Sequence, residues 1–100
     1  MTAATVLLFD ESLRGIRSDV QSLTLASETV TAGELIKERI RHKVNEVQAS
    51  EACERAFEAF ERNGFFMFVG DEQMESLEQR VLVTEALEVR FVKVMPLVGG

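Results

Sequence analysis

The chain has little of what a cross-linked or redox-active domain needs. Its 100 residues include one cysteine, Cys53, so no disulfide can form within the chain. A single thiol is typical of proteins in a reducing compartment, which predicts the cytoplasm. With 46% hydrophobic and 28% charged residues, the chain can build one ordinary globular core without metal or disulfide support. One domain is therefore expected.

Long hydrophobic runs and an excess of basic residues are also missing. The apolar run at 6–9 is much shorter than a signal peptide's apolar region or a membrane span. Eleven basic residues against seventeen acidic ones give a net charge of −6, which repels nucleic-acid phosphates. The sequence therefore predicts neither nucleic acid nor a membrane as a partner.

Groups for catalysis or metal binding are scarce as well. His42 is the single histidine and has no cysteine or histidine at the spacing of a zinc site. The carboxylate pairs Asp10-Glu11 and Asp71-Glu72 fall in predicted turns, where they are expected to be solvated and lack partners for acid–base catalysis. These residues therefore predict no metal site and no acid–base catalysis by the two carboxylate pairs.

Apolar spacing and turn residues predict the order of the elements. Thr31 and Glu34 form a capping-box pattern that begins a helix. The apolar stripe of that helix runs through Val47, and Ser50 then begins a second helix that ends at Asn63-Gly64. The predicted elements are strands at 3–9 and 17–26, helices at 32–48 and 50–62, and strands at 65–69, 79–83 and 87–94.

Two phenylalanines of the central strand form a candidate docking patch. Alternation places Phe66 and Phe68 on one face of the strand, opposite Phe65 and Met67. One interpretation buries the pair beneath the second helix. The other leaves it exposed as a surface for docking or self-association.

The segment Met95-Pro96-Leu97-Val98-Gly99-Gly100 contains the main candidate for function. Proline has no N–H group to donate, so Pro96 should end the last strand. Apolar residues then follow where a chain terminus usually has polar ones. The pattern indicates a functional tail that ends in the carboxylate of Gly100.

A hairpin, a helix and further strands that lead into Gly-Gly resemble the β-grasp fold of ubiquitin. The segment 89–100 is also similar to the closing strand, proline, apolar pair and double glycine of the sulfur carriers of molybdopterin and thiamine biosynthesis. Bacterial ubiquitin-like modifiers resemble the chain in size and in this apolar ending. The extra helix and the absence of arginine from the tail depart from the simplest members.

The resemblance implies an α+β fold of the β-grasp type. It implies a mixed sheet of about five strands packed on one main helix, with an additional helix before the third strand. Residues 1–94 would form the domain, and residues 95–100 an exposed tail.

The resemblance also implies the chemistry of the tail. An activating enzyme would use ATP to adenylate the Gly100 carboxylate, which would pass through enzyme thioesters to target proteins, with a conjugating enzyme and a deconjugating protease as further partners. The chain itself would bind no cofactor and would be a substrate of these enzymes, not an enzyme. Glycine lacks a Cβ and suits a narrow enzyme channel. Fully extended, the six tail residues would span about 20 Å. The residues implied for recognition in that channel are Pro96, Leu97, Val98 and Gly99.

Two alternative functions stay open. In a sulfur carrier, Gly100 would become a thiocarboxylate for cofactor or thionucleoside synthesis. In an assembly or interaction protein of similar fold, the tail would never be activated. For a modifier, the possible acceptors in chains of this protein are its three lysines, Lys37, Lys43 and Lys93.

Overall fold

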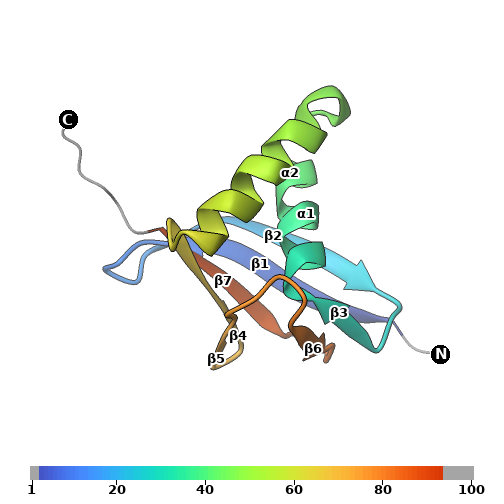
Figure 1. Ribbon diagram of the computed structural model, residues 1–100. Helices are drawn as coiled ribbons and strands as arrows, with labels where there is room; N and C mark the ends of the chain where they lie inside the picture. The colour runs from blue at the N-terminus through green and yellow to red at the C-terminus, as the bar shows by residue number, and fades with distance from the viewer. Residues whose placement is uncertain (1–2, 94–100) are drawn as a thin grey trace.

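The computed structural model describes residues 3–93, which form an α+β fold with a mixed five-stranded sheet and two helices. Figure 1 shows both helices on the same side of the sheet. The strand order is β2-β1-β7-β4-β5, with β1 and β7 parallel and the other neighbours antiparallel. The sheet strands are β1 (Ala4–Glu11), β2 (Arg17–Leu25), β4 (Phe65–Val69), β5 (Glu72–Gln73) and β7 (Glu88–Lys93).

The remaining elements cover one face of this sheet. Helix α1 (Ala32–Lys43) contributes buried side chains to the core, and α2 (Glu46–Glu61) packs beside α1. A separate two-stranded ladder joins β3 (Thr29–Thr31) to β6 (Arg80–Leu82). The predicted α+β class and the additional helix before the 65–69 strand are confirmed.

Alternate residues of the strands and one stripe of α1 form the hydrophobic core. Strand side chains point to opposite faces in turn, and β4 buries Met67 and Val69 on its core side. In β1 the three consecutive residues Leu8, Phe9 and Asp10 are all buried. The largest fully buried side chains are Val6, Leu8, Phe9, Leu35, Ile36, Met67 and Val89.

The start of α1 agrees with its predicted capping box. The Thr31 Oγ1 accepts a hydrogen bond from the Glu34 backbone N–H at 3.1 Å, and Glu34 Oε1 accepts one from the Thr31 N–H at 2.9 Å. These two bonds satisfy N–H groups that the first helical turn leaves without partners.

The predicted extension of this helix to residue 48 is wrong. Helix α1 ends at Lys43, because Val44 adopts an extended conformation with φ −131° and ψ 160°. Asn45 then caps α2, and its side chain accepts a hydrogen bond from the Gln48 N–H at 3.1 Å. Val47, predicted to lie on a buried stripe, is 92% exposed. Ser50, the predicted cap, lies inside α2.

Replacing the two residues separately distinguishes the observed cap from the predicted one. Asn45→Ala should lower the free energy of unfolding by about 1 kcal/mol, because the Gln48 N–H loses its acceptor. Ser50→Ala should leave it within about 0.5 kcal/mol of the parent chain, since Ala suits a helix interior. Urea denaturation followed by circular dichroism measures both. A larger loss from Ser50→Ala than from Asn45→Ala would contradict this helix start.

The structure alters three other predicted elements. Strand β1 extends beyond its predicted end at residue 9 to Glu11, whereas the predicted end of the last strand, residue 94, lies outside the described residues. The predicted strand at 79–83 is the shorter β6, which pairs with β3 and lies outside the main sheet. Glu72 of the predicted Asp71-Glu72 turn begins the two-residue strand β5. No helix within residues 3–93 combines the length and hydrophobicity required to cross a membrane.

Candidate functional site at the tail end of the sheet

The candidate site is the end of the sheet at which β7 stops. Strands β1 and β7 run parallel and pair up to Glu11 and Val92, so they end side by side. The β1–β2 turn therefore lies beside Lys93, the last described residue of β7. The predicted recognition residues, Pro96 to Gly99, and the predicted attachment site, Gly100, lie outside the described residues.

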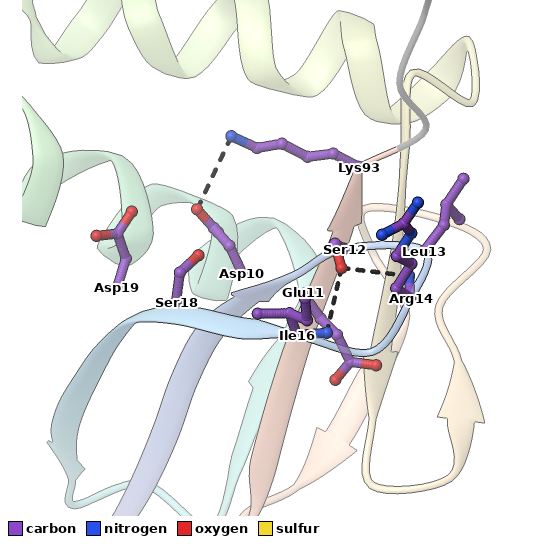
Figure 2. Close-up of a pocket in the computed structure, with 9 residues that line it drawn as sticks. All are labelled: Asp10, Glu11, Ser12, Leu13, Arg14, Ile16, Ser18, Asp19 and Lys93. Carbon is purple, nitrogen blue, oxygen red and sulfur yellow. Dashed lines mark hydrogen bonds and ion pairs between the residues drawn. The ribbon is translucent and has the colours of Figure 1, made fainter.

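A surface depression of about 610 Å³ occupies this end of the sheet (Figure 2). The Ser12 Oγ holds its turn in place by accepting hydrogen bonds from the Arg14 N–H at 3.2 Å and the Ile16 N–H at 3.1 Å. Leu13 and Ile16, which both line the depression, are 69% and 64% exposed. The depression thus has an apolar edge next to the start of the tail.

Asp10 is the centre of a charged cluster beneath the depression. Its carboxylate lies 2.7 Å from Lys43 Nζ, 3.1 Å from Arg39 Nη2 and 3.8 Å from Lys93 Nζ. The Arg39 Nη1 also donates a hydrogen bond to Gln21 Oε1 at 3.0 Å. The side chains of Asp10 and Arg39 are 11% and 4% exposed, so the prediction of a solvated turn carboxylate at Asp10 is wrong.

The charges around Asp10 determine its protonation. Burial raises the pKa of Asp10, but the hydrogen bond from Lys43 and the positive charge of Arg39 together lower this pKa below its ordinary 3.8. The carboxylate is therefore ionised at neutral pH. It cannot act as a general acid there, and its contribution is to hold three cationic side chains at this end of the fold.

A second cavity lies between the two helices and the end of the sheet, and Asp10 and Lys93 line both this cavity and the depression. It has a volume of about 230 Å³ and is referred to below as the helix notch. Asp10, Arg39, Lys43 and Lys93 contribute its charged groups. Its apolar lining consists of Ile36 and Ile40 from α1, Ala56 from α2, Phe65 from β4 and Phe91 from β7.

The predicted docking pair, Phe66 and Phe68, lies on the sheet face away from the helices. Neighbouring Met67 and Val69 point into the core, and the two phenylalanines are partly buried. The Arg90 guanidinium lies 4.9 Å from the centroid of the Phe68 ring. The pair is therefore not buried beneath α2, and its role in docking or self-association stays a prediction.

The three lysines predicted as acceptors differ in their surroundings. Lys43 and Lys93 both contact Asp10. Lys37 is exposed on α1 and has no ion pair within residues 3–93. Their use as acceptors stays a prediction.

Sequence reasoning missed the buried Arg39 and with it the helix notch. Arg39 follows Leu35 and Ile36 at helical spacing and so falls on the buried stripe of α1. A lone charge on such a stripe was the available signal. The carboxylate that pairs with it comes from another part of the chain and could not be identified from local spacing.

Comparison with known proteins gives no matching family model, no matching curated protein and no matching solved structure. Function is therefore inferred from the residues of this chain alone. Within residues 3–93, no group of three or more His, Cys, Asp or Glu side chains is placed to hold a metal ion.

Proposed function

We propose that this chain is a ubiquitin-like protein modifier with a β-grasp fold. Its Gly100 carboxylate is adenylated by an activating enzyme, transferred through enzyme thioesters and joined to target proteins. Residues 95–100 serve as the tail that enters the activating enzyme. Nucleophile, ATP and base come from the partner enzymes, so this chain is the substrate and not the catalyst.

The observation that carries the proposal is the parallel pairing of β1 with β7 at the centre of the sheet. This pairing brings the end of β7 beside the β1–β2 turn, and a β-grasp modifier needs its tail to start beside a surface that an enzyme can hold. The exposed Leu13 and Ile16 provide apolar contact area at that position. An enzyme docked there would hold the folded body while the tail, about 20 Å long if extended, reaches its active site.

Mass spectrometry of the protein from its native cells tests this function. Trypsin cleaves after Lys93, so a conjugated target should contain a lysine whose Nζ bears the branch Val94–Gly100. A sulfur carrier would instead give a free chain heavier by the difference between sulfur and oxygen. If cells that produce the protein contain neither the branched conjugate nor the heavier free chain, activation of the Gly100 carboxylate is excluded.

A further inference from the structure

The helix notch contains a buried charged group with unused hydrogen-bonding capacity. The Nε and Nη2 of Arg39 have no hydrogen-bond partner among residues 3–93. Nη2 lies 3.1 Å from the Asp10 carboxylate and forms an ion pair with it, so Nε is the donor left furthest from any acceptor. A buried guanidinium usually has its donors satisfied, because leaving them unpaired costs free energy. Both nitrogens are buried behind the notch surface, so Arg39 acts on the notch through its positive charge.

The surroundings of the notch favour an anionic group. Three cationic side chains, those of Arg39, Lys43 and Lys93, share the carboxylate of Asp10. Asp19 is more distant, at 3.7 Å from Lys43 Nζ, and is 64% exposed. Cations therefore outnumber carboxylates here, although the whole chain has a net charge of −6. A carboxylate at the notch would gain favourable charge–charge contacts.

The size of the notch favours one side chain over a free small molecule. Its volume of about 230 Å³ is below the roughly 300–1,000 Å³ of typical small-molecule pockets. Its isoleucine and phenylalanine lining suits one large apolar anchor of the kind that dominates protein interfaces. Lys93 lies at the rim, so a protein that holds the tail is already next to the notch.

We propose that the helix notch receives a large apolar side chain flanked by a carboxylate, presented by the enzyme that takes the tail. The apolar side chain packs among Ile40, Ala56 and Phe65, and the carboxylate lies near Arg39 and Lys93. This inference rests on the proposed function and adds to it a second contact surface, on the helix side of the tail. Engagement of the tail raises the effective concentration of this weak contact.

Peptide binding to the full chain tests the chemistry of the notch. Amide chemical shifts of the ¹⁵N-labelled protein would be followed during addition of acetyl-Glu-Leu-amide. Shifts are expected around Ile36, Ile40, Ala56 and Phe65. Acetyl-Lys-Leu-amide and acetyl-Glu-Ala-amide should each bind about tenfold more weakly, because one lacks the anion and the other the large apolar group. Equal binding of the three peptides, or shifts elsewhere only, would overturn the inference.

Paired variants link this binding to the notch. Ala56→Phe should fill the cavity and remove binding, whereas Ala49→Phe, on the same helix outside the notch, should not. Lys93→Glu should weaken the binding of acetyl-Glu-Leu-amide about tenfold. It should leave the fold intact, since the Lys93 side chain is 66% exposed. Lys37→Glu makes the same charge change elsewhere on the surface and should have little effect.

The same variants in native cells separate this inference from the proposed function. If the wild-type chain forms conjugates, and Ala56→Phe forms several-fold fewer while Ala49→Phe does not, the result supports both the notch inference and the proposed function. If the wild-type chain forms conjugates and Ala56→Phe forms as many, the notch inference alone is overturned. Absence of wild-type conjugates overturns the proposed function, while peptide binding still reports on the notch chemistry.

Three further measurements test whether the notch has a different occupant. Hexanoate that binds as tightly as acetyl-Glu-Leu-amide would indicate a site for small acids. Deletion of residues 95–100 that shifts the notch amides would indicate occupation by the chain's own tail. Shifts that depend on protein concentration without peptide would indicate a second copy. Each of these results would overturn the enzyme partner as occupant.

Discussion

A chain that lacks Gly99 and Gly100 is expected to form no conjugates, a loss of at least about a hundredfold. The deletion shortens an extended tail by roughly 7 Å and ends it on Val98, whose branched Cβ does not suit a channel shaped for glycine. The carboxylate would stop short of the nucleotide. Quantitative mass spectrometry of the branched tryptic peptides, after expression in the native cells, measures the loss.

The control for this deletion is the stability of the folded body. The described core residues end at Phe91 in the chain, and we expect the deletion to leave the urea midpoint unchanged. His42→Ala, an exposed replacement on α1, provides a chain with an intact tail for the same assay. Conjugates that persist at the wild-type level after the deletion would show that Gly100 is not the attachment point.

Asp10→Asn should destabilise the fold by about 3–5 kcal/mol at neutral pH. The replacement keeps the shape of the side chain but removes the negative charge that faces Arg39 and Lys43. Arg39 would then remain a nearly fully buried cation with Gln21 as its hydrogen-bond partner among the described residues. Urea denaturation of the two chains measures the difference in the free energy of unfolding.

A matched charge removal and a change of pH identify the cause of this loss. Glu51→Ala removes an exposed partner of Arg55 and should change stability by less than about 1 kcal/mol. The pKa of Asp10 is lowered in the fold, so its contribution is present above its ordinary pKa of 3.8 and is lost as pH falls below it. The gap between the parent chain and Asp10→Asn should therefore close in acid. A gap that is equally wide at pH 7 and pH 3 would indicate a packing defect.

Local signals in the sequence were sufficient for most of the fold. The capping box of Thr31 and Glu34 and the strand at 65–69, bounded by glycines, involve neighbouring residues, and the structure agrees with both. The division between α1 and α2 was missed because Val44 and Val47 continue the apolar spacing of the first helix. Asn45 interrupts that helix through a hydrogen bond that spacing alone does not show.

The candidate site likewise has a part that local sequence patterns predict and a part that depends on packing between distant segments. The tail was predicted from a contiguous pattern and lies outside the described residues, whereas the helix notch depends on side chains from both helices and three strands. Asp10 was predicted to lie in a turn because Asp-Glu-Ser is typical of turns. Its burial depends on Arg39 and Lys43, which reach it only when α1 packs on the sheet.

The position of β7 between β1 and β4 also constrains how the protein is made. Synthesis proceeds from the N-terminus, and β7 follows every other described element, so the ribosome releases the middle of the sheet after both of its flanks. Until then β1 and β4 each have an unpaired edge, through which the chain can aggregate with others or become open to degradation. A nascent chain that stops before Glu88 therefore cannot complete its sheet. Such truncated products would keep the exposed strand edges of an incomplete sheet.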